Sequence, residues 1–150
     1  MPFSIQKRRN DMMKQTWNLI QTGFAFTGGL VGWYLGGFDA SLYTLLAFVM
    51  VDYITGVLRA VNEKKVSSRI GAKGITKKIL IFLLVGVGHM LDLQLKTGNV
   101  LRDAVIFFYI SNEGISLLEN AVSIGLPVPE KVKEALKQLH GKEDETNGNQ

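Results

Sequence analysis

The chain has 150 residues, of which 47% are hydrophobic and 16 are glycine, and a formal net charge of +4. It has no cysteine, which excludes disulfides and thiolate metal sites. A soluble domain of this length would bury its core with amphipathic helices, whereas here the apolar residues gather in long stretches punctuated by glycine. The composition therefore favours an all-α integral membrane protein.

Four apolar stretches are candidates for membrane-spanning helices, because a helix needs about 20 mostly apolar residues to cross a bilayer. These candidate spans are residues 15–38, 40–58, 79–95 and 104–124, within a helical domain at 15–126. The basic segment 1–14 resembles the start of a signal peptide, but the apolar run after it is too long and ends in no small-residue cleavage site. We therefore expect four spans.

The placement of basic residues predicts the topology, because short loops rich in Lys and Arg remain cytoplasmic. Segment 1–14 has four basic residues and one acid, and the predicted loop 59–78 has seven basic residues and one acid. The connections at Asp39 and at residues 92–103 have no such excess. Four spans would leave both termini inside. Because orientation explains the basic residues, nucleic-acid binding is not expected.

The first candidate span is distinguished by Gly28, Gly32 and Gly36, which recur at four-residue intervals. On a helix this spacing places small residues on one face, where two backbones can approach closely. Packing within one protomer and self-association between protomers both satisfy this pattern.

The second candidate span contains an acid, Asp52. A charged residue near the centre of a spanning helix costs about 2.5–3.5 kcal/mol, so we expect Asp52 to face protein or water. Thr55 and Gly56 follow it on the same face, which favours a narrow, polar contact with a neighbouring helix. The carboxyl group is either ionised there or kept neutral by burial.

In the third candidate span, His89 and Asp92 are three residues apart and share a helix face, with Lys96 one turn further on. These residues would suit a proton relay, but an ion cluster at a helix end is the commoner arrangement. Two residues at this spacing are too few to predict a metal site.

The fourth candidate span is amphipathic, because polar residues recur along it at steps of three and four. The polar residues are Tyr109, Asn112, Glu113, Ser116, Glu119, Asn120 and Ser123. Such a helix cannot be surrounded by lipid, so it forms a polar seam in a bundle, lines a water-filled lesion, or lies on the membrane surface. The last alternative would reduce the number of spans to three.

The C-terminal region begins with Pro127 and Pro129, which end one helix and start another. Apolar residues at amphipathic spacing predict a short surface helix at 127–140. Residues 141–150 are small, charged and rich in amides, which predicts a disordered polar tail.

Several segments together resemble a known family, the toxin secretion/phage lysis holins. The segment Asp-Tyr-Ile-Thr-Gly-Val-Leu at 52–58, with Ala60, is similar to the family's second-span motif. The family's basic loop resembles Ser67-Ser68 followed by Gly71, Gly74, Lys77 and Lys78. Its C-terminal signature resembles residues 109–120 and 125–130, which Arg102 precedes. The resemblance covers about residues 35–140.

This resemblance implies a protein that oligomerises in the cytoplasmic membrane and opens lesions through which an endolysin or a toxin leaves. Its partners would be membrane lipids and further copies of itself, and the released cargo would pass without being bound. No cofactor is implied. No nucleophile and base pair or metal constellation emerges from the residues, so an enzyme is not expected.

Two other classes remain open at this point. A small proton-coupled exporter would use Asp52, Glu113 or Glu119 as its ion-coupling carboxyl group at a dimer interface. A membrane scaffold would use the basic loop to recruit a partner or anionic lipid. Escape of a folded cytosolic protein from the cell would separate a holin from both.

Overall fold

The computed structural model describes residues 3–136 and 138, and all regular structure within these residues is helical, which confirms the all-α class. The helices are α1 (Phe3–Tyr34), α2 (Ala40–Asn62), α3 (Ser68–Leu95) and α4 (Val100–Ile124), followed by helical residues 130–136. The predicted tail at 141–150 and the end of the predicted surface helix at 127–140 lie outside the described residues. The chain divides into two compact units, one up to Phe38 and one from Asp39 onward.

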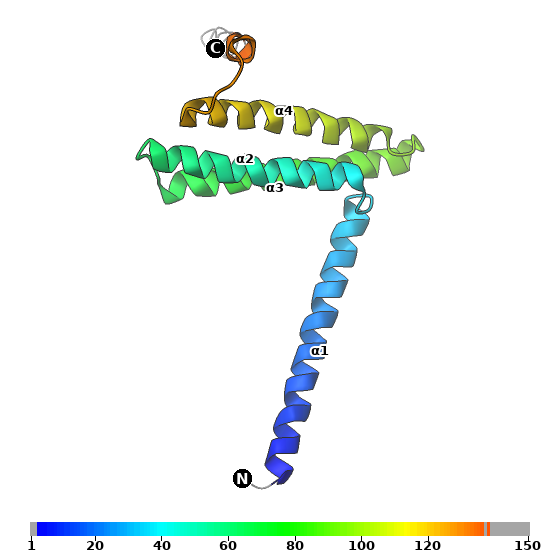
Figure 1. The fold of residues 1–150 in the computed structure, drawn as a ribbon. Helices are drawn as coiled ribbons and strands as arrows, with labels where there is room; N and C mark the ends of the chain where they lie inside the picture. Colours follow the sequence, from blue (N-terminus) through cyan, green and yellow to red (C-terminus); the bar gives the residue numbers. More distant parts are fainter. Residues whose placement is uncertain (1–2, 137, 139–150) are drawn as a thin grey trace. The chain divides into compact units, whose positions relative to one another are not determined.

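The first unit is the single long helix α1 (Figure 1). Every side chain described from Arg8 to Val31 is exposed, including Trp17 at 62% and Phe24 at 77%. Because its exposed surface from Gln15 onward is uncharged and partly aromatic, this part of α1 has the form expected of a helix that lies in lipid or packs on a partner.

A glycine pair ends α1. Gly36 and Gly37 have φ angles of 79° and 102°, and their N–H groups donate to the carbonyls of Trp33 and Gly32. Glycine takes this left-handed conformation without strain, and the bonds satisfy the last free carbonyls of the helix. Gly36 therefore lies beyond the helix, and only two glycines of the predicted stripe, Gly28 and Gly32, are on it.

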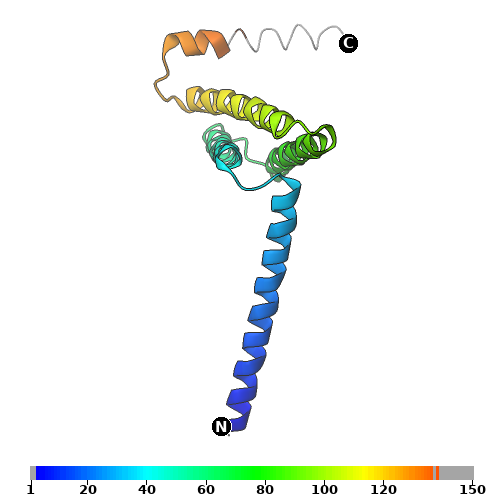
Figure 2. The ribbon, with the colours of Figure 1, turned by 90° about the vertical axis from the view of Figure 1, so that its right-hand side faces the viewer.

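The second unit packs α2, α3 and α4 side by side (Figures 1 and 2). Helix α4 packs along both α2 and α3, while α2 and α3 contact each other little. Apolar residues at steps of three and four form the core between them, since such residues share one face of a helix. The buried core residues are Leu42, Leu45 and Val49 of α2, Ile81 and Val85 of α3, and Ile106 of α4.

The predicted loop at 59–78 is mostly helical. Helix α2 continues to Asn62 and α3 begins at Ser68, so only residues 63–67 connect them. The prediction ended each span where charges begin, but the backbone hydrogen bonds of a helix continue into basic residues without interruption. The basic residues therefore lie mainly on helix ends, and their cytoplasmic location stays a prediction.

Two helical segments among the described residues are long and apolar enough to cross a membrane. They are Ala40–Asn62 and Gly71–Leu95, each with a mean hydropathy of 1.7. Only 22% and 28% of their apolar windows are buried, whereas the core helix of a soluble protein is mostly buried. Their outward apolar surface is consistent with lipid contact, and the arrangement with four spans stays a prediction.

Gly88 marks the closest approach of α3 to α4. A Cβ atom at Gly88 would lie 3.1 Å from the Arg102 Cα atom, whereas one at Gly74 would make an ordinary 3.5 Å contact with the Tyr53 ring. Helix α3 therefore needs glycine at position 88, where it meets the backbone of α4, but not at position 74, where it meets a ring of α2.

We predict that Gly74→Ala stabilises the protein by up to about 1 kcal/mol, because alanine loses less backbone entropy in a helix. Gly88→Ala should instead destabilise it by about 1–3 kcal/mol, because the methyl group meets backbone that cannot easily move. Thermal unfolding of both variants in the same detergent, followed by circular dichroism, measures the difference. Equal shifts in Tm would contradict the close packing at Gly88.

Candidate functional site: a buried ion cluster

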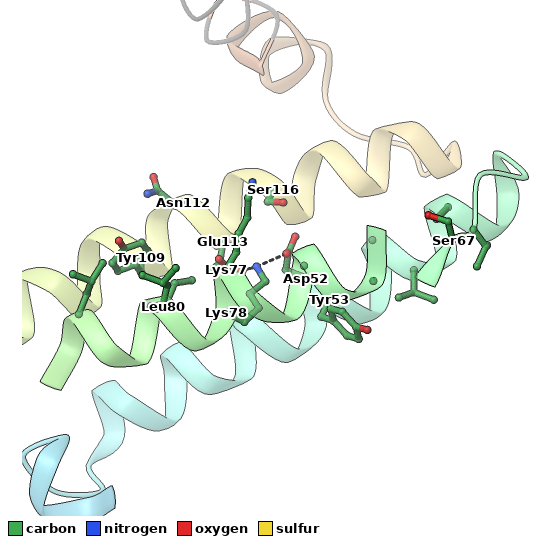
Figure 3. A pocket seen from close by; sticks show the side chains of 18 residues that line it. Asp52, Tyr53, Ser67, Lys77, Lys78, Leu80, Tyr109, Asn112, Glu113 and Ser116 are labelled. Atoms are coloured by element: carbon green, nitrogen blue, oxygen red, sulfur yellow. Dashed lines mark hydrogen bonds and ion pairs between the residues drawn. The ribbon is translucent and has the colours of Figure 1, made fainter. Parts of the chain in front are cut away.

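Three charged side chains from three helices meet inside the second unit (Figure 3). The ammonium group of Lys78 on α3 donates to Asp52 Oδ2 on α2, at 2.6 Å, and to Glu113 Oε2 on α4. The side chains of Lys78, Asp52 and Glu113 are 18%, 9% and 7% exposed. We call these three residues the ion cluster.

The side-chain amide of Asn120 also binds Asp52 of the ion cluster. Asn120 lies two helical turns after Glu113, and its Nδ2 donates to Asp52 Oδ1 at 3.1 Å and to Thr55 Oγ1 at 3.2 Å. A Cβ atom at Gly56 would make an ordinary 3.7 Å contact with Asn120 Nδ2, so this contact does not require glycine. The packing role of Gly56 stays a prediction.

Two carboxylates and one ammonium group leave the ion cluster with one surplus acid. Burial of charged groups is unfavourable unless they are paired and hydrogen-bonded, and here both acids share Lys78. Asp52 faces protein, which is one of the two alternatives that the sequence left open. The sequence does not predict its lysine partner, because Lys78 falls in the predicted loop 59–78. If that segment is helical, adjacent residues face different directions, so only one of Lys77 and Lys78 can point at Asp52.

A second polar group joins the helix ends at the opposite end of the unit. The guanidinium of Arg102, which is fully buried, donates to Asp39 Oδ2 at 2.7 Å and to Asp103 Oδ1 at 3.1 Å. Asp39 also caps α2 by accepting from the Leu42 N–H at 2.9 Å. The hydrogen bond from Arg102 holds the pKa of Asp39 well below its usual range. This contact ties the start of α2 to the start of α4.

Asp92 acts as a helix cap in this structure. Its carboxylate accepts from the Leu101 N–H at 3.0 Å, from the Arg102 N–H at 2.8 Å and from the Thr97 hydroxyl. A carboxylate at these N–H groups stabilises the start of α4. Nδ1 of His89 is buried and has no hydrogen-bond partner among the described residues. The geometry at Asp92 thus favours the structural alternative over a proton relay.

The polar residues of α4 divide into buried and outward groups. Of the predicted seam, Glu113 and Asn120 are buried, Asn112 is exposed, and Ser116 and Glu119 are partly exposed. The buried pair faces α2 and α3, and the less buried group forms a polar strip along α4, of which Asn112 and Ser116 line the cavity described below. The structure thus brings Asp52, Glu113 and Asn120 together and keeps His89 and Asp92 apart from them.

A cavity of about 700 Å³ lies beside the ion cluster, between α2, α3 and α4 (Figure 3). The glycines Gly56, Gly71 and Gly74 keep its walls open, and the three charged side chains line it. No group of three or more His, Asp or Glu side chains among residues 3–136 and 138 is placed to hold a metal ion.

Comparison with known proteins gives the family. The model of the bacteriophage holin family matches residues 29–141, which include all three residues of the ion cluster. The chain belongs to this holin family. Family membership and the two apolar helical segments indicate a non-enzymatic membrane protein, and holins as a family associate with membranes and oligomerise.

The relatives include proteins of bacteria and of a phage. An uncharacterised 14.9 kDa protein of Clostridium perfringens is 46% identical over 131 residues, covering 87% of this chain and 99% of the relative. An uncharacterised Listeria monocytogenes protein is 42% identical over 127 residues, covering 85% and 91%. A probable holin of Bacillus phage phi105 is 35% identical over 112 residues, covering 75% and 83%. No solved structure matches the chain.

We predict that Lys78→Met lowers the free energy of unfolding of this holin by about 3–5 kcal/mol, because two buried carboxylates lose their shared cation. Adding Asp52→Asn and Glu113→Gln should restore most of the loss, since no buried charge then remains. Lys77→Met is the matched control, because Lys77 is exposed and has no ion pair among the described residues. Thermal unfolding in detergent measures all three; an equal loss in the control would contradict the ion cluster.

Proposed function

We propose that this protein is a holin that accumulates in the cytoplasmic membrane, oligomerises, and forms lesions through which an endolysin, or a toxin, leaves the cell. The observation that carries the proposal is the family match over residues 29–141, supported by the phage relative named a probable holin. The cargo passes through the lesion and is not bound by the protein.

The proposed topology has four spans with both termini in the cytoplasm. Helix α1 carries no charge from Gln15 to its end at Tyr34, and α4 places its charged Glu113 against Lys78 inside the three-helix unit. Both helices can thus lie in a membrane although they are less apolar than α2 and α3. The basic ends of α2 and α3 lie on the cytoplasmic side in this arrangement.

The two faces of α4 support a mechanism for lesion formation. The inner face is occupied by the ion cluster, so it is not free to line a water-filled opening. Asn112, Ser116 and Glu119 form a polar strip along α4 beside the ion cluster, and this strip is unfavourable against lipid. When enough copies gather, these strips line the hydrated wall of the lesion, and association through the uncovered surface of α1 holds the copies together.

We predict that expression of the chain in bacteria releases a folded cytosolic reporter of tens of kilodaltons into the medium. A lesion that passes an endolysin also passes a protein of similar size, whereas an exporter passes only ions or small solutes. Reporter activity in the medium is measured alongside potassium efflux. Loss of potassium with the reporter retained would reject lesion formation and favour the exporter.

Gly28→Leu should delay release at equal membrane abundance. A Cβ atom at Gly28 has no neighbour within 4 Å, so leucine there meets nothing in its own helix and would act only on association. Gly32 is less suitable, because a Cβ atom there would lie 2.7 Å from the Phe38 ring. Ile20→Leu, on the same exposed helix, is the control, and the time from induction to reporter release is the measurement. Unchanged timing in Gly28→Leu would remove Gly28 from the association surface.

A further inference from the structure

The outer seam between α3 and α4 carries two hollows that share lining residues. The cavity beside the ion cluster reaches Leu84 and Tyr109, and a second hollow of about 420 Å³ continues from these residues along both helices. The second hollow is lined by Leu84, Val87, Gly88 and Leu91 of α3 and by Leu101, Ala104, Val105, Phe108 and Tyr109 of α4. We call the two hollows together the α3/α4 groove.

The α3/α4 groove is polar at one end and apolar at the other. Lys77 of α3 and Asn112 and Ser116 of α4 line the first hollow, whereas the second has no charged lining residue. Figure 3 shows these three residues on their two helices, around the cavity that also holds the ion cluster. A molecule that fits both ends has an anionic or hydrogen-bonding head and an apolar tail.

The polar end is lined by two carboxylates, Asp52 and Glu113, and by two ammonium groups, those of Lys78 and Lys77. Asp52 and Glu113 line the same hollow, but both accept hydrogen bonds from Lys78. Lys77 makes no ion pair among the described residues, so its ammonium group is available. The nearby basic residues Arg69 and Lys73 on α3 add to the positive potential at this end. The groove thus offers a cation where a phosphate group would lie.

The dimensions fit one leaflet of a bilayer. Lys77 and Leu91 are 14 residues apart on α3, and a rise of 1.5 Å per residue makes this about 21 Å. Half of the hydrocarbon core of a bilayer is about 15 Å thick, so the groove is long enough for one acyl chain.

We propose that the α3/α4 groove binds an anionic phospholipid of the cytoplasmic leaflet, with its phosphate at Lys77, Asn112 and Ser116 and one acyl chain along Leu84 and Leu91. A phospholipid accounts for both the cationic end and the apolar end, whereas an apolar helix of a second copy would leave Lys77 without a counter-ion. The inference rests on the membrane placement proposed above but not on lesion formation.

The test uses the purified full-length protein in phosphatidylcholine vesicles that contain spin-labelled phosphatidylglycerol or spin-labelled phosphatidylcholine. Electron paramagnetic resonance measures the fraction of each lipid that the protein immobilises. Lys77→Gln should lower the preference for phosphatidylglycerol about fivefold, the size expected for one basic residue near an anionic lipid. Lys73→Gln, one turn earlier and outside both hollows, should change it less than twofold.

A second pair of variants tests whether the acyl chain of the lipid lies in the groove. Leu84→Trp fills the junction of the two hollows and should reduce the immobilised fraction of both lipids, whereas Leu83→Trp, on the adjacent residue outside the groove, should not. Equal effects of Lys73→Gln and Lys77→Gln would overturn the proposal, because surface charge alone would then explain the preference. Disulfide dimers of the cysteine-free chain carrying Val87→Cys in phosphatidylglycerol vesicles would also overturn it, since a second copy would then cover the groove.

The two experiments can reject the lipid site and the holin function independently of each other. Protein that immobilises phosphatidylglycerol through Lys77 but releases no reporter would leave the lipid site intact and remove the holin function. Reporter release with no preference between the two lipids would support the holin function and reject the lipid site.

Discussion

The hydrogen bonds of Lys78 link all three helices of the second unit, including α2 and α3, which make few direct contacts with each other. Helices α2 and α3 contact each other little, and each touches α4. In lipid, apolar side chains gain nothing from leaving water, so helix association depends on packing and on polar contacts. Lys78 supplies such contacts to Asp52 on α2 and Glu113 on α4 at once. Without it, two buried acids would lose their shared cation, so Lys78 is the one side chain that pairs charges on all three helices.

The opposite end of the unit uses the same chemistry in a different form. Arg102 binds Asp39 at the start of α2, and Asp92 at the end of α3 caps the start of α4. Here the carboxylates of Asp39 and Asp92 accept hydrogen bonds from free N–H groups at the starts of α2 and α4, where an anion is favourable. The unit is thus closed by polar contacts at both ends, with an apolar core around Leu45, Val85 and Ile106 between them.

Sequence patterns predicted the helical class, the family and that Asp52 avoids lipid, because the first two depend on local periodicity or on a motif and the third on the cost of placing a charge in lipid. They did not predict the partner of Asp52. Lys78 stands among seven basic residues of segment 59–78, and a charge count treats all seven alike. Only the register of α3 against α2 and α4 distinguishes Lys78, which faces inward, from its neighbour Lys77. The end of α1 was missed for a related reason, since Gly36 continues the four-residue spacing but takes a left-handed conformation.

This division between Lys77 and Lys78 also separates stability from interaction with the membrane. Lys78 is held by two carboxylates, so its charge contributes to the fold and is unavailable to a ligand. Lys77 lies one residue earlier at the mouth of the same cavity, and its charge is open to an anion from outside. On the proposed function, the protein stays folded while its surroundings change as copies accumulate. Adjacent lysines that face different directions allow one helix to serve both purposes, because a change in the lipid at Lys77 need not disturb the contacts of Lys78.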